Sequence, residues 1–114
     1  MIINSSNDIC LASHVEVANR TLSRTIGLMG RNKIETDHAL LIYPCQQIHT
    51  YFMKFTIDCL FIDKQYQVVQ IIEGLKPWKI SKKISAGWGV IELPEGLVKG
   101  TDTHVNDRLI LELK

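Results

Sequence analysis

Short apolar runs, each closed by turn-forming residues, dominate the chain from Ala39 onward. The runs are rich in Val, Ile, Leu and aromatic residues, which is typical of β-strands. They cover Ala39–Tyr43, Ile57–Asp63, Val68–Ile72, Trp88–Leu93 and Arg108–Leu113. Only the tetrapeptide KQYQ separates the second run from the third, so this pair is predicted to form a hairpin.

The first thirty residues combine an extended pattern with a helical one. Ile9–Ala12 and Val15–Val17 predict the first extended segment. A helical period then starts behind Thr21, a suitable N-cap, and Gly30 can end the helix in a left-handed conformation. Apolar residues recur there at positions i, i+4 and i+7, as Leu22, Ile26 and Met29. The pattern predicts one short helix with a single apolar stripe.

These elements define the expected fold class. The sequence predicts a mainly β protein of the α+β class, with six or seven strands and one or two short helices. The most economical arrangement of so many short strands is a strongly curled sheet that approaches a small barrel. Neither a linker nor a repeat divides the 114 residues, so we expect a single domain over residues 1–114.

Composition and charge narrow the expected partners. Thirteen basic side chains nearly cancel twelve acidic ones, so an anionic partner must use a local patch, and we do not expect nucleic acid as the main partner. No apolar run is long enough to span a membrane, and the opening MIINSSNDIC does not resemble an export signal. The three cysteines fit a reducing compartment. We therefore expect a cytoplasmic protein, either a monomer or a weak dimer.

Two acidic residues lie inside predicted strands. Strand alternation places Asp58 on the same face as Leu60 and Ile62, and Glu92 on the same face as Val90. A carboxylate in such a position must be paired or hydrogen-bonded. We interpret both acids as structural anchors, and Arg24, Arg31 and Lys54 are the candidate cations that would hold Asp58. The alternative is a catalytic pair, with one raised pKa, in a small hydrolase or carbohydrate-active enzyme.

The cysteines and histidines invite two further chemistries. Cys45 and His49 could form a thiol nucleophile with its base, and Cys10 or Cys59 could add a zinc ligand. Zinc sites usually contain closely spaced ligand pairs, which this sequence lacks, and a catalytic thiol needs an orienting third group. We therefore expect no metal and no cofactor, and we interpret the cysteines as core thiols.

The segment LKPWKISKK, at residues 75–83, is too polar for a core strand. Trp78 follows a proline there, and four lysines surround the ring: Lys76, Lys79, Lys82 and Lys83. An indole ring can stack on a ligand while ammonium groups supply charge. With His49, Lys54 and Trp88, Trp78 and Lys79 complete the candidate ligand-binding set. The alternative is a solvated loop whose ring lies flat on the domain.

Four blocks, in this order and spacing, resemble the domain-of-unknown-function family 192 (DUF192, also called UPF0127). The blocks are RTIGLMGR (Arg24–Arg31), FMKFTIDCLFID (Phe52–Asp63), QVVQIIEGLKPW (Gln67–Trp78) and GVIELPEG (Gly89–Gly96). The resemblance covers nearly the whole chain. It implies a small, mainly β domain with a short helix at the GLMGR block, and it brings no established activity.

No complete catalytic set appears, which favours a non-enzymatic role and leaves the question of catalysis open. The leading hypothesis is a binding or accessory module for a small polar, sugar-like or protein ligand. Two alternatives remain: a small hydrolase that uses Asp58 and Glu92, and a nucleic-acid accessory protein that uses the lysines from Lys76 to Lys83.

Overall fold

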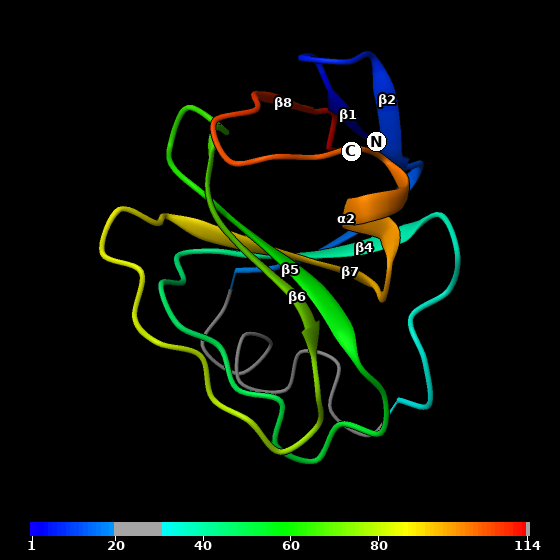
Figure 1. Cartoon of the computed structure of the whole chain (residues 1–114), viewed down its shortest axis with the longest axis vertical. Coiled ribbons are helices and arrows are strands. Elements are labelled where there is room, and N and C mark those ends of the chain that lie inside the picture. Colours follow the sequence, from blue (N-terminus) through cyan, green and yellow to red (C-terminus); the bar gives the residue numbers. More distant parts are fainter. Residues whose placement is uncertain (20–30, 114) are drawn as a thin grey trace.

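The structure is a computed structural model that describes residues 1–19 and 31–113. Its elements are mostly short strands (Figure 1). They are β1 (Ile2–Asn4), β2 (Ile9–Ala12), β3 (His14–Ala18), β4 (His38–Ile42), β5 (Ile57–Ile62), β6 (Val68–Leu75), β7 (Gly89–Pro94), the helix α2 (Leu97–Gly100) and β8 (Leu109–Leu111). The prediction of a mainly β fold is confirmed. The helix predicted behind Thr21 lies outside the described residues.

The strands form two open sheets, which corrects the prediction of a curled sheet close to a barrel. One sheet has three strands in the order β2-β1-β8, and the other has five in the order β3-β4-β7-β5-β6. Neither sheet closes on itself. The physical reason for the error is that side-chain alternation specifies which face a residue occupies but not which strand edges pair.

Most predicted strands form within a residue or two of their expected bounds. The β5–β6 hairpin is antiparallel, as predicted, and β4 pairs with β7. Two features did not follow from the pattern. β3 pairs with β4 in parallel, and β1 pairs with both β2 and β8. The pairing of β1 with β8 brings the two ends of the chain together at the top of Figure 1.

β5 lies in the middle of the core, and all six of its residues are buried. Leu60 and Ile62 belong to one apolar cluster, whereas Cys59 and Phe61 belong to a second cluster on the other face. This agrees with the alternation predicted from the sequence. Among the described residues, no helix has the length and apolar character needed to cross a bilayer.

Candidate functional site

Asp58 is fully buried on β5 and is held by backbone amides. Its Oδ1 accepts a hydrogen bond from Gly74 N at 2.9 Å, and its Oδ2 accepts from Gly96 N at 3.0 Å and Val98 N at 3.1 Å. Gly74 and Gly96 both have positive φ, a conformation that side chains rarely adopt. Asp58 therefore ties β6 and the start of α2 to the centre of the sheet.

The structure describes two of the three cations expected beside Asp58, and both lie elsewhere. Arg31 forms a hydrogen-bonded ion pair with Glu16 at 2.7 Å, and Lys54 is exposed. Arg24 lies outside the described residues. Three amide donors satisfy the carboxylate in the way that a cation would, because each N–H directs a partial positive charge at it.

Glu92 is also buried, with 3% of its surface exposed, but its environment is different. It lies on β7 between Leu40 on β4 and Cys59 on β5. Its Oε1 has no hydrogen-bond partner among the described residues. Burial raises the pKa of Glu92 to about 7, and the charge of Arg31 opposes that rise. The carboxyl group is thus poised to gain or lose a proton near neutral pH.

The two acids do not form the pair that acid-catalysed hydrolysis requires. Asp58 pairs across the strands with Leu93, and Cys59 pairs with Glu92. Since neighbouring residues alternate, Asp58 and Glu92 lie on opposite faces of the sheet, each among apolar side chains. Two carboxyl groups that flank one scissile bond must face the same cleft.

In the part of the chain that is described, the thiols form neither a disulfide nor part of a metal-binding cluster. Cys10, Cys45 and Cys59 form no disulfide, and the interpretation of all three as core thiols is wrong for Cys10, which is exposed. Cys59 is fully buried, and desolvation raises its pKa well above the usual value, with the nearby Glu92 carboxyl acting in the same direction. Cys45 donates to Gln47 O at 3.1 Å. Within residues 1–19 and 31–113, no group of three or more His, Cys, Asp or Glu side chains could hold a metal ion.

Thr50 joins two loops that project from the five-stranded sheet. Its hydroxyl donates to Lys76 O at 2.6 Å and accepts from Lys79 N at 2.9 Å. Its carbonyl oxygen accepts from Trp78 N at 2.9 Å and Met53 N at 3.2 Å. The side chain is fully buried, so these bonds are protected from competing water. Thr50 thus fixes the loop after residue 49 against the loop after residue 75.

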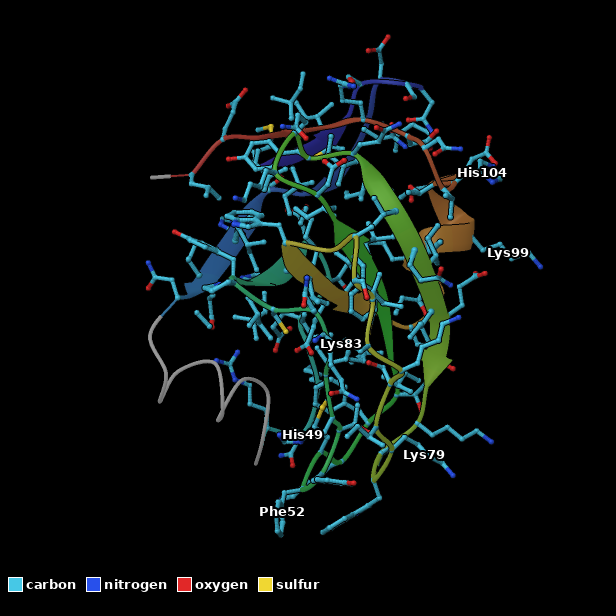
Figure 2. All side chains as sticks on the ribbon, turned by 90° about the vertical axis from the view of Figure 1, so that its left-hand side faces the viewer. His49, Phe52, Lys79, Lys83, Lys99 and His104 are labelled. Atoms are coloured by element: carbon cyan, nitrogen blue, oxygen red, sulfur yellow. The ribbon has the colours of Figure 1, made fainter. Side chains whose placement is uncertain are left out.

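The two loops place four large apolar side chains on the surface. We call this group the aromatic tip; it consists of Tyr51, Phe52, Trp78 and Ile80. Phe52 and Trp78 are each 59% exposed and meet edge to face, with 4.8 Å between their ring centres. Tyr51 is 6.2 Å from Trp78 and stacks on His49 at 5.0 Å. Figure 2 shows His49, Phe52 and Lys79 together at one end of the molecule.

The two segments that carry the aromatic tip have ionic charge of one sign. Residues 43–57 and 74–91 contain no Asp or Glu, but they contain five lysines: Lys54, Lys76, Lys79, Lys82 and Lys83. The rest of the chain therefore has eight basic and twelve acidic side chains. The near-neutral total therefore conceals two basic segments, which net charge alone did not reveal.

Trp88, the fifth residue of the predicted ligand-binding set, lies apart from the other four. Its ring stacks on Tyr43 at 4.7 Å, and Cys45 N donates to its carbonyl oxygen at 2.8 Å. Trp88 N donates to Ile62 O at the end of β5, whereas Leu75, which precedes the Trp78 loop, pairs with Ile57 at the start of β5. Five residue steps of a strand separate these two points, about 16 Å at about 3.3 Å per residue. Trp88 lines a separate cavity of about 350 Å³ together with Gly87.

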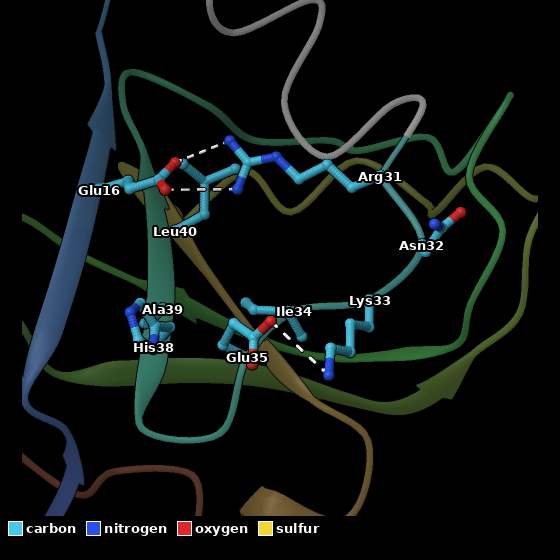
Figure 3. A pocket seen from close by; sticks show the side chains of 9 residues that line it. All are labelled: Glu16, Arg31, Asn32, Lys33, Ile34, Glu35, His38, Ala39 and Leu40. Atoms are coloured by element: carbon cyan, nitrogen blue, oxygen red, sulfur yellow. Dashed lines mark hydrogen bonds and ion pairs between the residues drawn. The ribbon is translucent and has the colours of Figure 1, made fainter.

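A second cavity, of about 380 Å³, was not foreseen from the sequence (Figure 3). The Glu16–Arg31 ion pair borders it, as do Lys33 and Glu35, whose charged groups are 3.6 Å apart. The residues come from β3, β4 and the segment between them. Each charge at its rim already has an opposite partner, so the cavity offers no uncompensated charge to a ligand.

Comparison with known proteins assigns the chain to a family. The DUF192 family model, described as an uncharacterized ACR, matches residues 2–111. The chain belongs to the DUF192 family. A UPF0127 protein of Pyrococcus abyssi is 36% identical over 115 residues, covering 96% of this chain and 95% of the relative. One from Pyrococcus horikoshii is 30% identical over 115 residues, with 96% of each covered.

Two solved structures share the DUF192 fold seen here. A protein of unknown function from Novosphingobium aromaticivorans superposes with a TM-score of 0.78 at 16% identity, covering 85% of this chain and 74% of that one. A Sinorhizobium meliloti protein, described provisionally as a transcription regulator, gives 0.74 at 27% identity, with coverage of 84% and 79%. The family and both structures support the fold, and the family has no assigned function.

Proposed function

We propose that this DUF192 protein is a non-enzymatic binding module and that the aromatic tip is its recognition surface. One observation carries the proposal: the tip exposes three aromatic rings that meet one another on two loops, together with Ile80. Ile80 pairs with His49, whose ring stacks on Tyr51. The exposed fractions in the tip are 38% for Tyr51, 59% for Phe52, 59% for Trp78 and 57% for Ile80. A contiguous apolar patch on a soluble surface usually marks an interaction site.

The backbone of the tip supports this proposal. Phe52 has a φ of 63° and Trp78 a φ of 64°, in the left-handed region where a bulky residue is disfavoured by about 1–2 kcal/mol. Glycine would occupy these positions more easily. Strained residues of this kind cluster at binding sites, where the surrounding structure holds them in place. The Thr50 hydrogen bonds supply that support, because they fix the backbone at Trp78 and at Met53, next to Phe52.

The chemistry of the tip indicates the class of ligand. Aromatic rings offer stacking and apolar contact, and the lysines offer positive charge on segments that contain no carboxylate. A sugar-like or small polar ligand would use mainly the rings. A ligand with an apolar part and a negative charge would use both, and this class fits the surface best.

The two alternatives fare differently. The hydrolase hypothesis is disfavoured because Asp58 and Glu92 face opposite sides of the sheet. Nucleic-acid binding is supported by the lysines and by the provisional description of the Sinorhizobium meliloti relative. A single strand could stack bases on Trp78 and Phe52. We therefore retain nucleic acid as the second candidate.

The two tryptophans allow a direct test. Trp88→Phe leaves Trp78 as the single indole, on the tip, whereas Trp78→Phe leaves Trp88, away from it. Each variant is titrated with an acidic aromatic peptide, a neutral oligosaccharide, a single-stranded oligonucleotide and anionic phospholipid vesicles. We expect at least one anionic probe to shift the emission of Trp78 and to leave that of Trp88 unchanged. No response at Trp78 to any of the four probes would contradict the proposed function.

A further inference from the structure

The four residues of the aromatic tip are of the types found where a protein meets a lipid headgroup layer. Tryptophan and tyrosine favour that layer because their rings are amphipathic, and phenylalanine and isoleucine favour the hydrocarbon just below it. Phe52 and Ile80 are more than half exposed, so both side chains are free to leave water. The aliphatic side chain of Ile80 cannot stack on a nucleic-acid base, but in a bilayer it would remove additional apolar surface from water.

The lysines nearest the tip complement an anionic surface. Lys54 follows Phe52 by two residues, and Lys76 and Lys79 flank Trp78. All three are exposed. Since no carboxylate occurs in residues 43–57 or 74–91, nothing on these segments repels a negatively charged headgroup. Long lysine side chains can keep their ammonium groups at the phosphate level while the rings lie deeper.

Four backbone N–H groups of the tip's loops have hydrogen-bond partners within the protein. Trp78 N and Met53 N donate to Thr50 O, and Lys79 N donates to Thr50 Oγ1. Tyr51 N donates to His49 Nδ1 at 3.3 Å. A loop that enters a headgroup layer loses water, and unpaired backbone groups there are costly. These four hydrogen bonds avoid part of that cost.

We propose that the aromatic tip docks this protein on the surface of an anionic lipid bilayer. Phe52, Trp78 and Ile80 enter the headgroup region, and Lys54, Lys76 and Lys79 contact lipid phosphates. The protein lies on the membrane and does not cross it. This inference rests on the proposed function, since it names the ligand of the same surface.

The test measures partition of the full chain into vesicles. Trp88→Phe protein, with Trp78 as its single indole, is mixed with phosphatidylcholine vesicles that contain either no phosphatidylserine or about one-third. We expect a blue shift of Trp78 emission, and cosedimentation, with the anionic vesicles only. Raising the salt concentration weakens the binding because it screens the surface potential. Soluble glycerophosphoserine, which offers the headgroup without a bilayer, produces no shift.

Charge variants locate the contact. Lys76→Gln with Lys79→Gln lowers the partition coefficient by about fivefold for each lysine. Lys64→Gln with Lys99→Gln is the matched control, and Figure 2 shows Lys99 well away from Lys79, toward the middle of the molecule. The control pair leaves partition unchanged. All four lysines are exposed, so both double variants should fold, which unfolding curves verify.

Apolar variants provide an independent readout. Phe52→Ser with Ile80→Ser lowers partition by more than about tenfold, because two exposed apolar side chains no longer leave water. Val105→Ser with Ile110→Ser is the control, since these side chains are 45% and 47% exposed and lie outside the tip. Equal losses in both pairs would overturn the proposed contact.

The outcomes separate this inference from the proposed function. If the oligonucleotide or the peptide shifts Trp78 emission and anionic vesicles do not, the membrane inference fails and the binding module stands. If no probe shifts it, both fail. Binding to neutral and anionic vesicles with equal affinity, or binding that the tip variants leave intact, would also overturn the inference.

Discussion

Glu92 is a single carboxyl group that changes how the fold responds to pH. Strand alternation predicted that it shares a face with Val90, and both belong to the side of the sheet that contains Cys59. The interpretation of Glu92 as an anchor remains a prediction, since its Oε1 has no partner among the described residues. Burial alone accounts for its raised pKa, because desolvation disfavours the charged form.

The raised pKa of Glu92 predicts a loss of stability with rising pH. The pKa is about 7 in the folded protein against an ordinary value of 4.5, so the folded state binds the proton more tightly. Between these two pH values the free energy of unfolding falls as pH rises, by about 3 kcal/mol in all. Below pH 4.5 the group imposes no penalty, and above pH 7 the penalty is complete. Urea unfolding from pH 4.5 to pH 8 measures this slope.

The Glu92→Gln variant removes the titrating group and serves as the comparison. We expect the difference between the two proteins to grow with pH, in favour of the variant, and to level off above pH 7. His104, whose pKa is raised mainly by its hydrogen bond to Asp102, is present in both proteins and cancels in the difference. A difference that does not vary with pH would contradict the assignment.

Among the elements, α2 depends on a residue from another strand. The helix has four residues, and its N-cap, Gly96, offers no side chain to the first amides. Asp58 on β5 accepts from Gly96 N and Val98 N in its place. The sequence indicated that Asp58 must have a partner. The sequence could not show that backbone amides of α2 are that partner, because a helix of four residues has no recognisable periodic pattern.

Asp58→Asn should destabilise the fold by about 2–3 kcal/mol. The amide keeps one oxygen acceptor but turns its NH₂ group toward backbone N–H donors, which leaves buried donors unpaired. The urea midpoint measures the loss. Glu95→Gln, a nearby exposed acid, is the control and should change the free energy of unfolding by less than about 0.5 kcal/mol. Similar effects from both variants would show that the amide contacts do not stabilise α2.

Across the molecule, β1 joins the two ends of the chain. Ile2 is fully buried and belongs to the apolar cluster beside β5, and Asn4 donates to Asp107 at 2.8 Å. Three residues are too few for an alternation pattern, so the sequence did not predict this strand. Its pairing with β8 builds the smaller sheet, and Leu11 and Leu109 of that sheet belong to the same apolar cluster as Ile2.

Ile2→Ala therefore tests whether β1 belongs to the cooperative fold. We expect the free energy of unfolding to fall by about 3 kcal/mol, because the substitution leaves a cavity in the cluster. Ile3→Ala is the control in the same strand; its side chain alternates to the other face and is only half-buried, so it should cost clearly less. Equal losses would contradict the packing of Ile2, and denaturant unfolding of both variants decides the question.

The candidate site was only partly accessible from the sequence. His49, Lys54, Trp78 and Lys79 were singled out, because aromatic and basic residues in a polar segment indicate a surface. Tyr51, Phe52 and Ile80 were missed, since the pair YF and an isolated isoleucine resemble core residues. The absence of acids across residues 43–57 and 74–91 was the available signal.

Local pattern settled which stretches become strands and which side chains share a face. The reason is that the two-residue repeat of a strand depends on neighbours along the chain. The pairing of β3 with β4, the separation into two sheets and the meeting of Phe52 with Trp78 depend instead on the path of the chain between distant segments. Contacts of that kind arise from packing the whole core, so they appear only in the folded protein.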